Sequence, residues 1–345
     1  MSQNILLKGK APGDIPVDRH KIGVSYSGGG PLVLIELGIA RAFVRMGIVP
    51  DVIAGVSAGG LAGTAHALDP HTGKGIDMAA RLLCQISSRT LGLDVDTLAG
   101  RVRFAGRLLA QRTRLGSLGD NAPIKPYITR GLTQDIGLRD VTIGLFAPPA
   151  YPKLRIGATN RLNGAAEWFP ADTRIEDALV ASSAIPGVFP WRAMTLGERP
   201  VIVVDGGVVT NQPLSTLALE EGCGTIIACA VGYGGGGVAA PTNALDNALG
   251  SVALLAHQCE KMEEAYVRVK IGAHGVVHHI HPEVAFPVQG YNFTPPIVEQ
   301  IIGESCERTL AWLTEHRDAI IMARHQPAAV ADPLHWLRQP WPDED

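Results

Sequence analysis

The chain has 345 residues, of which 46% are hydrophobic and 18% charged, and it carries a formal net charge of −3. This length and composition are those of a globular protein able to bury a core, built as one large α/β domain or two small ones. The slightly acidic balance gives no general attraction to nucleic acid or to anionic membranes. Nucleic acid is therefore not expected as a partner.

The residue pattern also bears on compartment and on cofactors. The five cysteines show no zinc-type spacing, and no apolar run approaches the ~20 residues of a membrane span. The first residues show no secretory signal pattern. We therefore expect a soluble, cytoplasmic protein with reduced thiols, no metal and no cofactor.

The first predicted elements are a strand, a glycine turn and a helix. Residues 1–20 are polar and are predicted to form a poorly ordered lead-in. A short β-prone run at 22–26 ends in the turn SGGG at 27–30, and apolar residues then recur at helical spacing to residue 46. Such a turn directs several backbone N–H groups to one point and can hold an anion. Because Val33 breaks the dinucleotide-binding pattern and no Walker lysine follows, an oxyanion hole for acyl transfer fits the turn best.

The next stretch, DVIAGVSAGGL at 51–61, contains a G-x-S-x-G motif between an apolar run and a helix-forming segment. Gly55 and Gly59 bracket Ser57 because the turn is too sharp to leave room for Cβ atoms beside the serine. The turn lifts Ser57 Oγ above the carboxyl end of the strand, where N–H groups of the following helix point. Ser57 is therefore the candidate nucleophile, with a chance match in a glycine-rich chain as the alternative.

Residues 81–145 are predicted to be helical and of mixed polarity, a segment that could cap the site. Within them, the stretch 99–119 contains five arginines and no acid, with Phe104, Leu108, Leu109 and Leu115 among the arginines. A solvated helix face is the favoured interpretation of this stretch, and peripheral contact with an anionic membrane is the functional alternative. The arginines are Arg101, Arg103, Arg107, Arg112 and Arg114.

The α/β pattern returns after residue 153. The apolar run 201–204 is typical of a strand in a buried parallel sheet, and Asp205 follows it directly. Carboxyl ends of parallel strands share one edge, so Asp205 is expected beside Ser57 as the base that removes its proton. A turn aspartate before glycine is the structural alternative. The other predicted elements are strands at 154–159, 225–231 and 276–280 and helices at 175–184, 244–270 and 296–316.

Three motifs in this order resemble the patatin-like phospholipase family: SGGG at 27–30, GVSAGG at 55–60 and VDGGVVTNQP at 204–213. Two weaker blocks agree with it, DNAPI at 120–124 and ASSAIPGVFP at 181–190. The resemblance implies an acyl hydrolase domain over residues 21–315, followed by a tail at 316–345. The implied fold is a three-layer α/β/α arrangement with a central, mostly parallel sheet.

The resemblance also implies a mechanism, in which a Ser–Asp dyad without histidine hydrolyses the acyl esters of lipids. By position, Ser57 would be the nucleophile and Asp205 the base, while Gly28, Gly29 and Gly30 would supply the oxyanion N–H donors. The family usually has Arg or Lys two residues after the triple glycine, followed by another glycine. Here Leu32 and Val33 stand there, which weakens the case for phosphate recognition and makes a neutral ester or lysolipid the alternative substrate to a phospholipid.

Alternatives remain open at this point. A Ser-His-Asp triad would need one of the histidines that follow Asp205. The run HHIHP at 278–282 could also suggest a metal site. Histidines with an ordinary structural place in a strand are favoured over either alternative. Acyl transfer shares its acyl-enzyme with hydrolysis, and the sequence does not separate them. It also does not fix the oligomeric state. The candidate histidines are His257, His274, His278, His279 and His281.

Overall fold

The computed structural model describes residues 17–93, 117–231, 244–284 and 290–322. Most of the arginine-rich stretch 99–119, including all five arginines, lies outside the described residues. The same holds for most of the predicted lead-in and tail. The account below concerns the described part of the chain.

A single sheet of eight strands crosses the molecule in the order β5-β6-β3-β2-β1-β7-β8, with β4 paired to β3. The five strands β3, β2, β1, β7 and β8 pair in parallel, and the pairs β3–β4, β3–β6 and β5–β6 are antiparallel. The strands are β1 (Asp18–Tyr26), β2 (Val52–Val56), β3 (Lys153–Asn160), β4 (Ala165–Trp168), β5 (Arg192–Leu196), β6 (Arg199–Val204), β7 (Cys223–Cys229) and β8 (Val276–Ile280).

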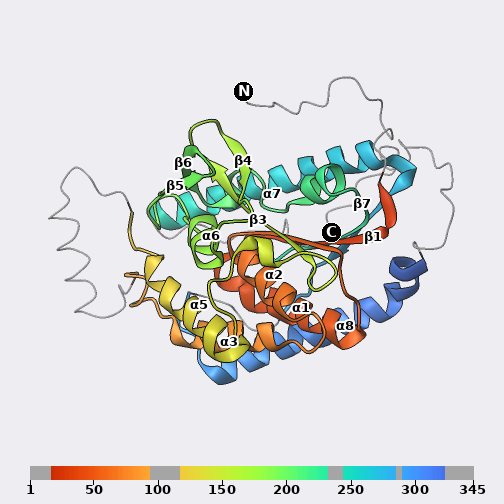
Figure 1. Ribbon diagram of the computed structural model, residues 1–345, viewed down its shortest axis with the longest axis horizontal. Helices are drawn as coiled ribbons and strands as arrows, with labels where there is room; N and C mark the ends of the chain where they lie inside the picture. Colours follow the sequence, from red (N-terminus) through yellow and green to blue (C-terminus); the bar gives the residue numbers. More distant parts are fainter. Residues whose placement is uncertain (1–16, 94–116, 232–243, 285–289, 323–345) are drawn as a thin grey trace.

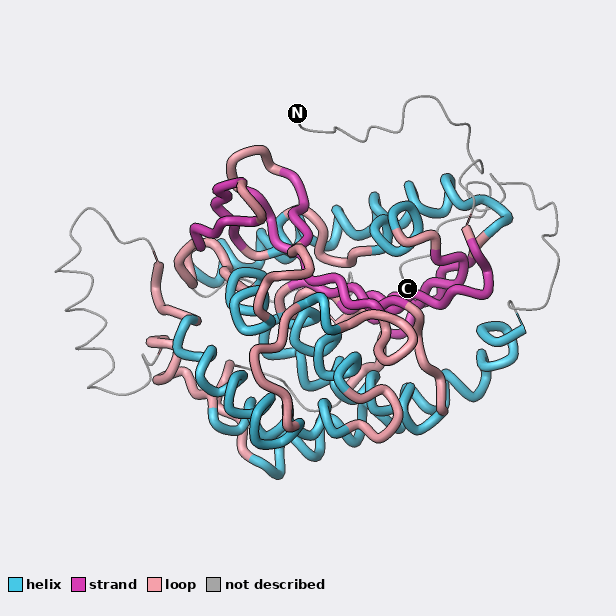
Figure 2. Tube along the Cα trace, viewed as in Figure 1, coloured by secondary structure: helices cyan, strands magenta, loops and turns pink. Residues whose placement is uncertain are grey.

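Helices cover both faces of this sheet, which lies as a band between them in Figure 2. One layer contains α1 (Val33–Met46), α2 (Ala58–Leu68), α3 (Lys74–Gln85), α5 (Lys125–Gly131), α6 (Ile175–Ser182) and α8 (Pro295–Met322). The opposite layer contains α7 (Ala244–Ile271), seen above the sheet in Figure 1, and a π-helical turn, Thr216–Glu220. The predicted three-layer α/β/α fold with a mostly parallel sheet is confirmed.

The alternation of buried side chains along β2 explains the two layers. Ile53 belongs to the larger core beneath α1 and α2, whereas Val52 and Ala54 belong to the smaller core beneath α7. A strand whose two faces are both apolar must be covered on both sides. The smaller core is completed by residues such as Leu217, Ile226 and Val267.

The register brings the key turns to one edge. Tyr26, the last residue of β1, lies opposite Gly55 of β2 and Cys229 of β7. The glycine turn after β1 and the Ser57 turn after β2 therefore leave the sheet side by side at its carboxyl edge.

The prediction that 201–204 forms a parallel strand was wrong. β6 returns from β5 through a hairpin with the two-residue turn Gly197-Glu198, so it runs antiparallel to the core strands. It overlaps β3 only at their carboxyl ends, where Val204 lies opposite Thr159. Because β6 approaches from beyond the edge of the parallel core, its last residue still arrives at that edge. Asp205 reaches the expected place by a different route.

Two element boundaries also differ from expectation. In the described part of 81–145, α3 ends at Gln85 and α5 is followed by short 3-10 and π turns, so the segment is only partly helical. The last helix, α8, continues to Met322.

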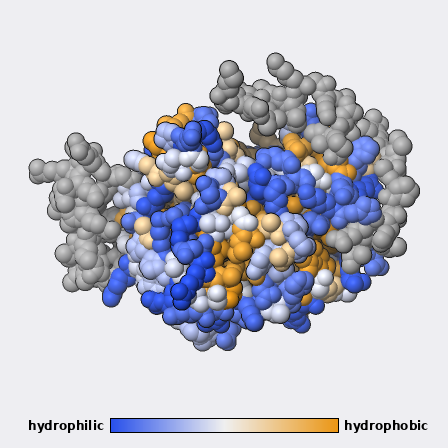
Figure 3. All heavy atoms as spheres, in the orientation of Figure 1, coloured by the Kyte–Doolittle hydropathy of each residue, from blue (hydrophilic) through white to orange (hydrophobic). Residues whose placement is uncertain are grey.

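None of the described helices combines the length and apolar character needed to cross a membrane. Hydrophilic residues cover most of the described surface turned to the viewer in Figure 3, with hydrophobic residues gathered in patches.

Candidate active site

Ser57 occupies a strained turn between β2 and α2. Its backbone has φ 52° and ψ −123°, a combination that residues other than glycine rarely adopt. The flanking glycines allow the turn to pack closely. A Cβ on Gly55 would lie 2.2 Å from the carbonyl oxygen of Gly59, and one on Gly59 would lie 2.3 Å from that of Tyr26. Both distances are impossible for a real side chain, so both positions require glycine.

The Ser57 and Asp205 side chains meet directly. Ser57 Oγ donates a hydrogen bond of 2.6 Å to Asp205 Oδ2, and each residue is only 6% exposed. The other carboxylate oxygen, Oδ1, accepts the N–H of Gly207 at 2.8 Å. Asp205 itself is fixed through its backbone N–H, which donates to the carbonyl of Ala184 at 2.9 Å. The carboxylate is therefore held with one oxygen aimed at the serine hydroxyl.

Burial also changes the ionisation of the Asp205 carboxylate. Burial raises the pKa of Asp205 to about 6, while the hydrogen bonds from Ser57 and Gly207 oppose the rise. A base with a pKa just below neutral pH is ionised under ordinary conditions and still holds a proton well enough to transfer it.

Ser182, the last residue of α6, positions the serine turn from below. Its Oγ accepts the backbone N–H of Ser57 at 2.8 Å and donates to the carbonyl of Gly157 at 2.5 Å. The side chain is completely buried. Sequence reasoning assigned no role to Ser182. The available signal was a buried serine in the apolar segment ASSAIPGVFP, which needs a hydrogen-bond partner.

The glycine turn is clamped at its first residue. Gly28 donates its N–H to the carbonyl of Asn211 at 3.0 Å, and Asn211 Nδ2 donates to the carbonyl of Gly28 at 3.2 Å. Asn211 Nδ2 also donates to Glu260 of α7. The N–H of Gly28 is thus already in use.

Gly29 and Gly30 differ from Gly28 because they open a 3-10 helix, Gly30–Leu32. The first N–H groups of a helix have no partner within it. Within the described part of the chain, no acceptor is found for either N–H. Of the three glycines singled out from the sequence, these two retain backbone N–H groups that could donate hydrogen bonds to an oxyanion.

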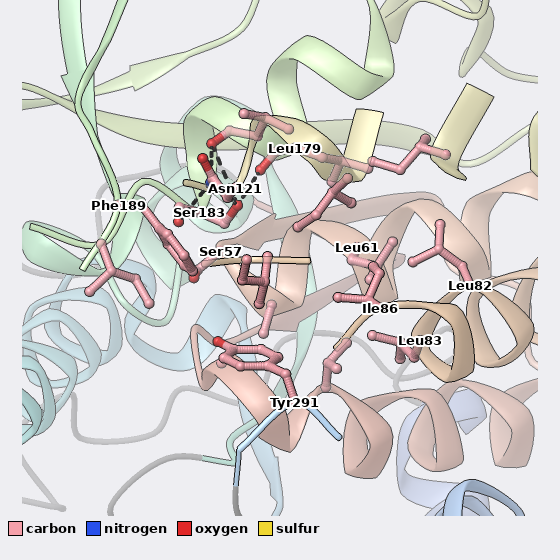
Figure 4. Close-up of a pocket in the computed structure, with 18 residues that line it drawn as sticks. Ser57, Leu61, Leu82, Leu83, Ile86, Asn121, Leu179, Ser183, Phe189 and Tyr291 are labelled. Carbon is pink, nitrogen blue, oxygen red and sulfur yellow. Dashed lines mark hydrogen bonds between the residues drawn. The ribbon is translucent and has the colours of Figure 1, made fainter. Parts of the chain in front are cut away.

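Two pockets meet at Ser57, which lines both of them. Gly30, Ile185 and Tyr291 also line both pockets. The first is a narrow cavity of about 80 Å³, shown in Figure 4, with apolar walls from α2, α3 and α6. The second is wider, about 590 Å³, and contains Asp205 together with Leu32. The aliphatic and phenylalanine side chains labelled in the wall of the narrow pocket are Leu61, Leu82, Leu83, Ile86, Leu179 and Phe189.

The candidate histidines lie mostly elsewhere. His279 Nε2 pairs with Glu264 at 2.8 Å, His281 Nδ1 with the carbonyl of Ala230 at 2.8 Å, and the ring of His278 packs against Trp312. His257 is the one of the five that lines the wider pocket with Ser57, and its Nδ1 lies 3.6 Å from Glu260. Among the described residues, no three His, Cys, Asp or Glu side chains gather closely enough to hold a metal.

Comparison with known proteins places this geometry in context. The sequence profile of the family described as "Patatin-like phospholipase" matches residues 24–218. The comparison with curated proteins found no match. Among solved structures, VipD from Legionella pneumophila aligns with a TM-score of 0.42 at 14% identity, covering 87% of this chain and 68% of VipD. Human GIVD cytosolic phospholipase A2 aligns with a TM-score of 0.46 at 10% identity, covering 90% of this chain and 63% of the human protein.

Proposed function

Because the chain belongs to the patatin-like phospholipase family, we propose that it is a serine hydrolase that cleaves the carboxylic esters of lipids through a Ser57–Asp205 dyad. The observation that carries the proposal is the 2.6 Å hydrogen bond between the two buried side chains. A serine hydroxyl is a weak nucleophile unless a base lies within such a distance. The strained turn that presents Ser57 supports the same role.

In the proposed mechanism, ionised Asp205 takes the Ser57 proton as Oγ attacks the ester carbonyl carbon. The carbonyl oxygen becomes an oxyanion, and the N–H groups of Gly29 and Gly30 stabilise it. Collapse of this intermediate breaks the ester C–O bond, and Asp205 returns the proton to the departing alcohol. Asp205 then deprotonates a water that attacks the acyl-enzyme, and it returns this proton to Ser57 Oγ as the bond to the acyl group breaks and the carboxylic acid leaves.

The two pockets suggest how the substrate lies. The narrow apolar pocket suits the acyl chain, and the wider pocket beside Asp205 suits the departing alcohol. Leu32 lines the wider pocket where the family usually has a cation, and Val33 is buried at 2% exposure. This arrangement favours an uncharged ester or a lysolipid as the alternative to a phospholipid. Since such substrates reside in membranes or micelles, we propose a cytoplasmic enzyme that meets them by peripheral contact.

Labelling with a fluorophosphonate tests the proposal most directly. The wild-type protein should form a covalent adduct at Ser57, located by peptide mass spectrometry, and the Ser57→Ala variant should form none. A panel of a monoacylglycerol, a lysophospholipid and a diacyl phospholipid with the same acyl chain then ranks the substrates. Release of free fatty acid indicates hydrolysis, whereas an ester of an added alcohol indicates acyl transfer. A wild-type protein that neither reacts with the probe nor cleaves any ester would contradict the proposal.

A further inference from the structure

Tyr291 stands at the junction of the two pockets, four residues before α8 begins at Pro295. It is one of the few residues that line both pockets together with Ser57. In Figure 4 its ring enters the pocket with the hydroxyl end turned toward Ser57. A Cβ on Gly30 would lie 3.1 Å from the Tyr291 hydroxyl oxygen. The phenol therefore lies directly beside the glycine turn.

Some of the hydrogen-bond donors near Ser57 already have acceptors within the protein, and others do not. The N–H of Ser57 is taken by Ser182, and that of Gly28 by the carbonyl of Asn211. The N–H groups of Gly29 and Gly30 have no acceptor among the described residues. The Tyr291 hydroxyl has no hydrogen-bond partner among the described residues, so it is a third donor available at the same place.

The protonation state of Tyr291 suits a donor. Burial, and then the negative charge of Asp205, raise the pKa of Tyr291 to about 12. The phenol therefore keeps its proton near neutral pH, where Asp205 is ionised. Asp205 and Tyr291 both line the wider pocket, in which the proposed reaction takes place.

We propose that the Tyr291 hydroxyl donates a hydrogen bond to the ester carbonyl oxygen of the substrate and holds it as it becomes an oxyanion, beside the N–H of Gly30. The inference rests on the proposed acyl hydrolase function. No proton is transferred in this step, since the phenol keeps its hydrogen throughout. The carbonyl oxygen is the favoured acceptor over the departing alcohol because the phenol lies next to the glycine turn.

The test is Tyr291→Phe, which removes only the hydroxyl and keeps the ring that lines both pockets. Loss of one oxyanion donor lowers kcat on the order of 10²-fold. We expect that loss in kcat with little change in KM, measured on two esters that share an acyl chain, one with a nitrophenol and one with an aliphatic alcohol. Both should lose the same factor because both form the same oxyanion. Tyr151→Phe is the matched control, since Tyr151 packs against Phe146 and lines neither pocket.

A second measurement separates this role from a structural one. A trifluoromethyl ketone bearing the same acyl chain forms an oxyanion adduct with a reactive serine, so Tyr291→Phe should weaken its inhibition by the same factor as kcat/KM. Activity within twofold of wild type, or a loss confined to the ester with the poorer leaving group, would overturn the inference. Ser57→Ala in the same assay separates the two claims. If wild type cleaves no ester, or Ser57→Ala remains active, the proposed function itself fails.

Discussion

Replacement of Asp205 by Asn should abolish activity and at the same time stabilise the fold. Burial raises the pKa of Asp205 from 3.8 to about 6, so the folded protein disfavours the ionised carboxylate. The difference between these two pKa values corresponds to a loss of roughly 3 kcal/mol in folding free energy when the carboxylate is ionised. An amide of the same shape has no charge to bury, and it can still accept from Gly207 and contact Ser57. Asp205→Asn should therefore be more stable than wild type near neutral pH.

The pH dependence follows from the direction of the shift. A carboxyl group whose pKa is higher in the folded protein than in the unfolded chain contributes its full stabilisation only below the pKa of the unfolded chain. That stabilisation is lost as the pH rises through the pKa of the folded protein. The gain from Asp205→Asn should thus be largest above about pH 7 and should fall below about 1 kcal/mol at pH 4. Urea unfolding at pH 4, 5, 6 and 7.5 measures it, with the exposed Asp172→Asn as control. In the same variant, kcat should fall on the order of 10⁴-fold. A variant less stable than wild type at pH 7.5, or a gain that does not change with pH, would refute the reasoning.

Three further outcomes are expected. Ser57→Ala should lose on the order of 10⁴-fold or more in kcat with its fold intact. His257→Ala should lose far less than the ~10²-fold that removal of a general base costs. Equal losses in the two variants would mean that a triad operates. Ser182→Ala leaves the Ser57 N–H and the Gly157 carbonyl buried without their partner, so it should destabilise the fold by about 2–4 kcal/mol in urea unfolding and lower kcat, and an unchanged midpoint would contradict this. For wild type, kcat/KM should rise with pH through about 6 and level off as Asp205 ionises; a profile flat from pH 5 to 8 would exclude Asp205 as the base.

The sequence was sufficient for the parallel core and for the expectation that Ser57 and Asp205 lie side by side. Each parallel core strand contains a short apolar run, and the turns after β1 and β2 are marked by glycines. The direction of β6 could not be obtained in this way, because an apolar run looks the same whether its partner strand is parallel or antiparallel. The hairpin turn Gly197-Glu198 was the only local signal of its direction.

The finer arrangement of the site depended on contacts between residues that are far apart in the chain. Ser182 meets Ser57 across 125 positions, and Asn211 meets Gly28 across 183. Which N–H groups of a glycine turn stay available is decided by such distant partners. A local pattern therefore predicts that the turn binds an anion, but not which of its donors do so. The place of Tyr291 beside Gly30 belongs to the same class of information.

The segment from Asp205 to Asn211 connects the carboxylate that contacts Ser57 with the residue that holds the glycine turn. One end contains the proposed base and the other holds the glycine turn, and Asn211 also contacts Glu260 of α7. Asp205 is held by the carbonyl of Ala184, whereas Asn211 is held by α7 through Glu260. A shift of α7 would therefore act through Asn211 on the glycine turn and change its position relative to Asp205. Since a displacement of about 1 Å can cost on the order of 10²-fold in rate, the packing of α7 against this segment bears directly on the proposed reaction.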